Sequence, residues 1–228
     1  MKSRKIIVAL DSNNLNRTIK LVKKLKKDVY AFKIGYQFFF NFGLNGYKKI
    51  YDICPKIFLD LKLHDIPNTV YETIIGFNDC KIDMLTVHLS GGEEMLNKAM
   101  LAAKSINAKV IGVSILTSLD EKDSLALFNN KIEDQISHLF KIALKANIDG
   151  IVCSPHELEI ANTILGTHVI KITPGIRDVK VEDDQERTMS AKEAIKKGST
   201  YLVIGRPITQ ADDVAHSLQN FNDTIHEK

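Results

Sequence analysis

Residues 57–65 read Ile-Phe-Leu-Asp-Leu-Lys-Leu-His-Asp, an apolar run in which charged residues occupy alternate positions. Successive side chains of a β-strand point to opposite faces, so the three leucines share one face and Asp60 and Lys62 share the other. Burying two charges is costly unless they are paired. This stretch therefore predicts a strand that packs its leucines against helices and turns Asp60 and Lys62 toward a polar site.

Similar short runs, rich in β-branched residues, recur along the whole chain and alternate with longer amphipathic stretches. The predicted strands are residues 5–10, 29–34, 57–61, 84–89, 110–116, 150–153, 168–172 and 200–204. Each interval is long enough for a helix, and a helical stretch, residues 211–226, follows the last run. Strands that alternate with helices form a parallel sheet, and eight such units predict an α/β protein with a single (β/α)8 TIM barrel.

The length is consistent with one barrel domain over residues 1–228, because such barrels typically need about 200–250 residues. The 31 basic and 28 acidic residues nearly balance, which argues against nucleic-acid or membrane-surface binding. The three cysteines are far apart and have no CxxC spacing. This pattern argues against a disulfide framework and a zinc site, and predicts a reducing, cytoplasmic location. The N-terminal residues contain no apolar stretch typical of a signal peptide.

The two predicted strands that precede residues 57–61 also carry charged residues near their C-terminal ends, where a barrel has its active site. Asp11 ends the first run and Lys33 lies within the second. A structural ion pair would explain Asp60 and Lys62 alone, but four charges on three adjacent strands favour a functional cluster. Two lysines at the barrel mouth favour an anionic substrate over a divalent metal, so no metal site is expected. We expect His88 to be a structural or substrate-edge residue.

A second group of residues follows the seventh and eighth strands, where barrels commonly bind phosphate. Thr173-Pro-Gly-Ile-Arg177 follows the seventh run, and Gly205-Arg206 follows the eighth. Arg206 could hold a phosphate by two parallel hydrogen bonds. Residues 173–186 form the longest irregular stretch and are a candidate lid. The role of Asp65 stays open at this point. A predicted helix begins just after it, so capping by Asp65 or Asn68 is as plausible as catalysis.

These segments together resemble the orotidine 5′-phosphate decarboxylase family over nearly the whole chain. The resemblance is carried by Val8–Asp11, Phe32–Gly35, Asp60–Thr69, Val87–Gly92, Leu116–Ser118, Val152–Ser154, Thr173–Arg177, Asp184-Gln185 with Arg187, and Ile204–Thr209. The DxKxxD pattern alone is shared with magnesium-dependent sugar-phosphate barrels. This chain differs from those magnesium-dependent barrels in three features: Lys33, the DIPNT sequence at residues 65–69, and the combination of PGIR at 174–177 with DQxR at 184–187.

The resemblance implies decarboxylation of orotidine 5′-monophosphate to UMP and CO2 in de novo pyrimidine biosynthesis, without cofactor or metal. It implies that Lys62 stabilises charge at C6 and then protonates it, within a catalytic set of Lys62, Asp60, Asp65 and Lys33. The implied substrate-binding residues are Asp11, Lys33, Asp60, Thr69, Thr117, Arg177, Gln185, Gly205 and Arg206. Asp65 and Thr69 would reach the partner's site in a homodimer, which accounts for the ambiguity of Asp65.

Two alternative functions remain open on the sequence. The first is a magnesium-dependent sugar-phosphate barrel decarboxylase or epimerase, which a chelator would inactivate. The second is a catalytically silent barrel that binds a nucleotide, although such a barrel would be free to lose its buried charges. A nucleic-acid-binding module is disfavoured because the charge is balanced and no basic–aromatic patch is visible.

Overall fold

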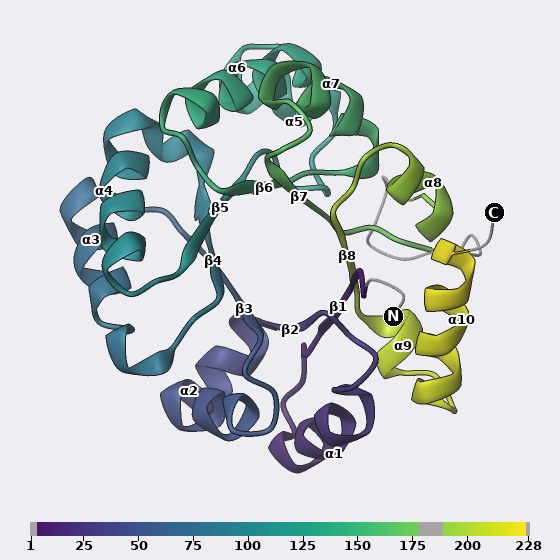
Figure 1. Cartoon of the computed structure of the whole chain (residues 1–228). Helices are drawn as coiled ribbons and strands as arrows, with labels where there is room; N and C mark the ends of the chain where they lie inside the picture. Colours follow the sequence, from purple (N-terminus) through teal and green to yellow (C-terminus); the bar gives the residue numbers. More distant parts are fainter. Residues whose placement is uncertain (1–3, 178–188, 227–228) are drawn as a thin grey trace.

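A computed structural model describes residues 4–177 and 189–226. Eight parallel strands close into a barrel in which each strand pairs with the next and β8 pairs with β1. The strands are β1 Ile6–Ala9, β2 Ala31–Gly35, β3 Ile57–Leu63, β4 Met84–His88, β5 Lys109–Val113, β6 Gly150–Val152, β7 Ile170–Thr173 and β8 Tyr201–Ile204. The predicted TIM barrel is thus confirmed, and Figure 1 shows the view along its axis.

The helices form a ring outside the strands, as Figure 1 shows. They are α1 Leu15–Leu25, α2 Tyr36–Tyr51, α3 Pro67–Ile75, α4 Gly92–Ser105, α5 Glu121–Phe128, α6 Ile132–Lys145, α7 Leu158–Leu165, α8 Ala191–Lys196, α9 Arg206–Thr209 and α10 Val214–His226. Asn14 caps α1 by accepting a hydrogen bond from the backbone N–H of Arg17 at 3.0 Å. Within the described residues, no helix is long and apolar enough to cross a membrane.

The alternation of side chains along each strand divides the core into two layers. Leu59 and Leu61 face outward and pack in the large layer between the sheet and the helices. Phe58 faces inward, into a smaller cluster that fills the barrel with Ile7, Ala31, Met84, Ile111 and Ile172. Each fully buried side chain of this size contributes about 1.5–3 kcal/mol, so the barrel is held mainly by the hydrophobic effect.

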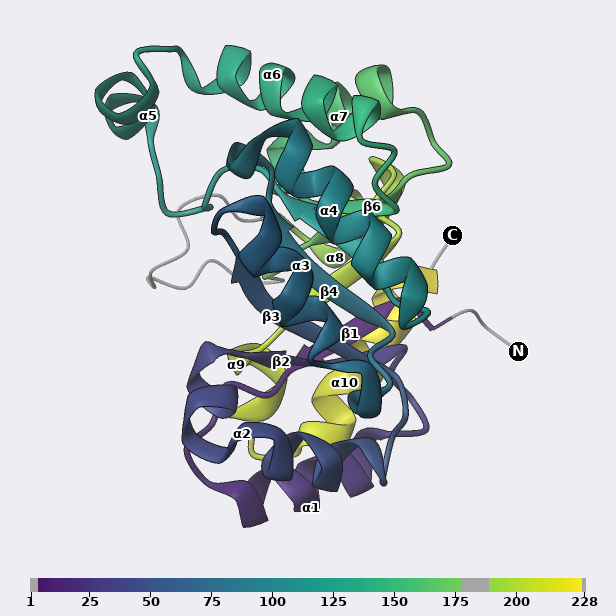
Figure 2. The same ribbon diagram turned by 90° about the vertical axis from the view of Figure 1, so that its left-hand side faces the viewer.

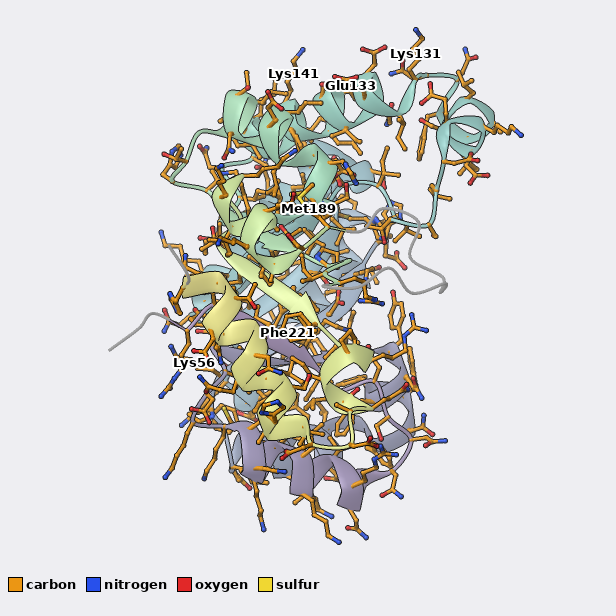
Figure 3. All side chains as sticks on the ribbon, turned by 90° about the vertical axis from the view of Figure 1, so that its right-hand side faces the viewer. Lys56, Lys131, Glu133, Lys141, Met189 and Phe221 are labelled. Carbon is orange, nitrogen blue, oxygen red and sulfur yellow. The ribbon has the colours of Figure 1, made fainter. Side chains whose placement is uncertain are left out.

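Two aromatic rings stack at the end of the barrel at which the strands begin. Tyr30 and Tyr201 stack with their ring centroids 3.8 Å apart, and the ammonium of Lys56 lies 4.6 Å from the Tyr30 centroid. Figure 3 shows Lys56 at this end of the molecule, whereas Lys131 and Lys141 lie on the outer side of α6. A cavity lies at the opposite end of the barrel, where the strands end.

Three local features differ from the sequence prediction. The fifth strand ends at Val113, and part of the following connection forms the separate helix α5, which stands out from the barrel in Figure 2. Helix α2 is kinked at Gly43, whose φ of 54° lies in the left-handed region that glycine tolerates best. The predicted last helix, residues 211–226, begins instead at Val214, and the short helix α9 precedes it.

Candidate active site

Four charged side chains form a continuous chain at the mouth of the barrel. The ammonium of Lys33 lies 3.1 Å from Asp11 Oδ1 and 3.4 Å from Asp60 Oδ2. The ammonium of Lys62 lies 2.9 Å from Asp60 Oδ1. Negative and positive groups therefore alternate across three neighbouring strands, and the structure brings together the charges that the sequence placed at the strand ends.

Asp60 is the centre of this chain and is only 7% exposed. Burial alone would raise the pKa of its carboxyl, but the ammonium groups of Lys33 and Lys62 lower that pKa below its usual value. Burial likewise opposes the charge of Lys33, whereas Asp60 and Asp11 raise its pKa. Both groups are therefore ionised at neutral pH, and the pairing offsets the cost of removing them from water.

Gly35 makes room for the pair between β1 and β2. A Cβ at this position would come 2.9 Å from Lys33 Nζ and 3.1 Å from Asp11 Oδ1. Such contacts would push the ammonium away from its carboxylate. The glycine that follows Lys33 by two residues thus allows the ion pair to form close to the backbone.

The backbone of β3 is irregular where it carries Lys62. Lys62 has a φ of 41°, which a non-glycine residue rarely adopts, and the β3–β4 register shifts between Leu59 and Leu63. The Lys62 backbone N–H donates to Thr86 Oγ1 at 2.7 Å, and Thr86 Oγ1 donates to Asp60 Oδ1 at 3.1 Å. Thr86 was missed in the sequence, where the only signal was a hydroxyl within the apolar run at 84–89.

A cavity of about 590 Å³ lies above the charged chain. Lys33, Asp60 and Lys62 form part of one wall, while Arg177 and Arg206 lie on the side formed by β7 and β8. The predicted residues that line this cavity are Asp11, Lys33, Asp60, Lys62, Thr117, Arg177, Gly205 and Arg206. Gln37, Thr209 and Gln210 also line it and were not predicted from the sequence. The cavity thus combines a charged wall with cations that suit an anionic group.

The loop after β7 is tied at its base. The Arg177 N–H donates to Met189 O at 3.0 Å, and the Met189 N–H donates to Gly175 O at 3.1 Å. Gly175 has a φ of 75°, a conformation that favours glycine at the start of this turn. Gln185 and residues 178–186 of the predicted lid lie outside the described residues. The two hydrogen bonds fix where the loop leaves the barrel and where it returns.

Asp65 and Thr69 lie in an adjoining hollow of about 420 Å³ rather than in this cavity. Lys62 borders both spaces. Neither Asp65 nor Asn68 caps α3: its N-cap is Ile66, which makes no side-chain capping bond, and Asp65 Oδ1 accepts from the Ile66 N–H at 2.7 Å. Pro67, in the first turn of α3, has no backbone N–H and so needs no acceptor, which removes one reason for a cap.

His88 also borders this hollow, and its ring centroid lies 5.3 Å from that of His64. Burial, followed by the nearby His64 and Lys62, lowers the pKa of His88 to about 4. The imidazole is therefore neutral at physiological pH. Across the described part of the chain, no three His, Cys, Asp or Glu side chains are grouped so that they could hold a metal ion.

A larger groove, of about 810 Å³, lies between α6 and α7, away from the charged cluster. Isoleucines and carboxylates dominate its described lining, which includes Ile132, Ile160, Glu133 and Glu159 but no lysine or arginine. An anionic substrate would be repelled there. The cavity at the barrel mouth is the better candidate for an active site, although it is the smaller of the two.

The arrangement at the mouth agrees with comparisons to known proteins. Residues 4–221 match the sequence model of the Orotidine 5'-phosphate decarboxylase / HUMPS family. The chain belongs to this family. A protein named Orotidine 5'-phosphate decarboxylase from Pseudoalteromonas translucida is 41% identical over 229 residues, which cover 98% of each chain. A protein of the same name from Ehrlichia chaffeensis is 41% identical and covers 94% of each chain.

A solved structure supports the same membership. The crystal structure of Orotidine 5'-phosphate decarboxylase from Lactobacillus acidophilus matches with a TM-score of 0.86 and 33% identity, covering 99% of this chain and 100% of that one. The family resemblance predicted from the motifs is therefore confirmed, and so is its barrel fold. The roles of the individual site residues are a separate question, which their geometry addresses below.

Proposed function

We propose that this protein decarboxylates orotidine 5′-monophosphate to UMP and CO2, with Lys62 stabilising the charge at C6 and then protonating it. The observation that carries this proposal is the Lys62–Asp60 contact of 2.9 Å in a cavity that also contains Arg177 and Arg206. Family membership and the names of the curated relatives support the same reaction. Those relatives also support a place in de novo pyrimidine biosynthesis.

The chemistry requires a positive charge close to C6. When the bond between C6 and the carboxylate breaks, CO2 leaves and the electron pair stays on C6, where no adjacent carbonyl is placed to delocalise it. A fixed ammonium stabilises that developing charge because it needs no reorganisation during the reaction. Lys62 then transfers a proton to C6 to give UMP, and its neutral amine takes up a proton from solvent.

The other members of the charged chain hold the substrate and Lys62 in place. A substrate carboxylate bound beside Lys62 also lies beside Asp60, whose like charge disfavours the bound ground state more than the transition state. In this proposal Lys33 and Asp11 bind the ribose hydroxyls, and Thr117 contacts the pyrimidine. The alternating charges keep Asp60 and Lys33 ionised and orient the side chains beside them.

The phosphate would bind at the opposite wall of the cavity. Arg177 and Arg206 supply guanidinium groups that match phosphate geometry, and Gly205 leaves its backbone close to the ligand. Gln185 completes this set in the proposal. Binding energy from these contacts, remote from C6, would stabilise closure of the loop and so assist the chemical step.

We further propose a cytoplasmic homodimer in which Asp65 and Thr69 complete the partner's site. Phe40 is 79% exposed and stacks on Tyr36, which lines the adjoining hollow, with their ring centroids 5.7 Å apart. Ile66 is 68% exposed and directly follows Asp65, which lines the same hollow. Large apolar side chains that gather at one place on a surface are typical of an interface. A second copy of the chain would cover them and bring its own Asp65 toward Lys62.

The test follows the loss of orotidine monophosphate absorbance with EDTA present. Wild type should turn over, Lys62→Ala should lose activity yet bind UMP, and Lys141→Ala, on the outer side of α6, should behave as wild type. Turnover by Lys62→Ala would refute its role as proton donor. Wild type that neither turns over orotidine monophosphate nor binds UMP would favour a magnesium-dependent sugar-phosphate enzyme, and UMP binding without turnover would favour a silent barrel.

A further inference from the structure

We propose that Thr86 is a positioning residue, which sets the Lys62 ammonium and the Asp60 carboxylate for the chemical step without contacting substrate. Thr86 is fully buried in β4 and lies behind Asp60, outside the described lining of the cavity. The inference rests on the proposed function, because it assigns Thr86 a role in the reaction at C6.

The Thr86 hydroxyl closes a ring of hydrogen bonds around both catalytic groups. Its oxygen accepts from the Lys62 backbone N–H at 2.7 Å and its proton goes to Asp60 Oδ1 at 3.1 Å. The same carboxylate oxygen accepts from Lys62 Nζ at 2.9 Å. A hydroxyl has one proton and two lone pairs, so it can make both bonds at once. One side chain thus holds the lysine at its backbone and the carboxylate at its oxygen.

The irregular strand explains why this hydroxyl is needed. Leu59 pairs with Leu85 and Leu63 with Val87, so the chain advances four residues along β3 but only two along β4. A bulge of this kind removes a backbone N–H from the sheet ladder, and a buried N–H without an acceptor is costly. Thr86 supplies that acceptor at Lys62, where a positive φ, which residues other than glycine rarely adopt, adds backbone strain.

A purely structural threonine would make the backbone bond alone, and the chain contains an example. Thr200 Oγ1 accepts from the Lys171 backbone N–H at 3.0 Å at the start of β8, at the end of the barrel opposite the cavity. Thr86 makes the same kind of bond but also donates to the carboxylate that pairs with Lys33 and Lys62. Burial raises the pKa of Asp60, but the two lysines and then the hydrogen bond from Thr86 lower it below its usual value.

The test compares Thr86→Val with Thr86→Ser and with the matched control Thr200→Val. Valine keeps the branched shape and removes the hydroxyl. We expect Thr86→Val to lower kcat about 10- to 100-fold, since small displacements of reacting groups have effects of this size. We expect KM to change less than about threefold, because phosphate and ribose contacts provide the binding. Thr86→Ser should restore kcat, and Thr200→Val should leave it unchanged.

Two further readouts separate positioning from loss of stability. Thermal unfolding should show both variants folded at the assay temperature, with the larger loss in Thr86→Val, which loses the hydrogen bond to Asp60 as well as the acceptor of a backbone N–H. The acid limb of the kcat profile should move to higher pH in Thr86→Val only, because Asp60 loses a hydrogen bond that favours its charged form. Wild-type kcat in Thr86→Val, or failure of serine to rescue it, would overturn the proposal. An inactive wild type would instead refute the proposed function and the Thr86 role with it.

Discussion

Lys33 and Asp60 belong to neighbouring strands, and their charged groups lie 3.4 Å apart where the barrel opens. Gly35 is in register with Asp60, so the lysine reaches forward along its own strand to meet the carboxylate. This pair ties β2 to β3 by charge as well as by the sheet ladder. Because Lys33 also contacts Asp11, its loss would disturb the whole chain of charges.

Replacing Lys33 by methionine should destabilise the protein by about 3 kcal/mol, because the buried carboxylate of Asp60 loses one of its two cations. Urea unfolding at pH 7 measures this. The control is Lys24→Met, which breaks the Lys24–Asp213 pair, whose side chains are 51% and 62% exposed. Exposed pairs contribute less than about 1 kcal/mol. Equal losses in the two variants would show that burial does not distinguish the pairs.

His88 should make the protein less stable in mild acid. Its pKa is about 4 in the folded state against 6.5 for an unperturbed histidine. Between these values the unfolded chain binds more protons, so the free energy of unfolding rises with pH. The contribution of His88 to the free energy of unfolding is fully present above pH 6.5 and declines as the pH falls toward 4. Asp60, whose pKa is lowered from 3.8, loses its own contribution only below that window.

The measurement is the unfolding temperature between pH 7 and pH 4.5. Wild type should lose stability over this range, and His88→Gln should lose less because it has no buried imidazole to protonate. His216→Gln, at an exposed position on α10, should follow wild type. If His88→Gln and wild type have parallel curves, His88 does not control the acid sensitivity.

The strand order and the charged cluster could be predicted because both follow from local patterns. Period-two alternation in residues 57–63 places Asp60 and Lys62 on the inner face, and a parallel barrel brings strand ends together whatever the loops do. The structure agrees on both points. Arg177 and Arg206 were found for the same reason, since Arg177 lies in the loop after β7 and Arg206 begins the helix after β8.

The remaining features depend on contacts between distant segments. The positive φ of Lys62 and its bulge arise from the β3–β4 register, which no pattern within β3 reveals. Thr86 looks like an ordinary strand residue until its two partners are seen. The role of Asp65 could not be predicted because this residue lines the adjoining hollow and not the main cavity. Sequence periodicity does not show which cavity a loop residue borders.

Arg206→Ala should weaken binding of UMP about 10- to 100-fold, because a charge-assisted contact to phosphate is lost. Uridine has no phosphate, so its affinity should not change. Calorimetric titration of both ligands measures the difference, with Arg4→Ala, an exposed position before β1, as control. Equal weakening of UMP and uridine would mean that Arg206 supports the cavity generally and does not contact the phosphate.

Mixing two inactive variants tests whether Asp65 acts across a dimer. In a heterodimer of Lys62→Ala and Asp65→Ala, one site carries both substitutions, while the other keeps Lys62 from one subunit and Asp65 from its partner. Random reassociation makes half of the dimers heterodimers, so about a quarter of wild-type activity should return. Unfolding and refolding the two variants together, and then measuring turnover, gives this value. If activity stays absent although heterodimers form, Asp65 serves the site of its own subunit, and the hollow beside Lys62 belongs to a single chain.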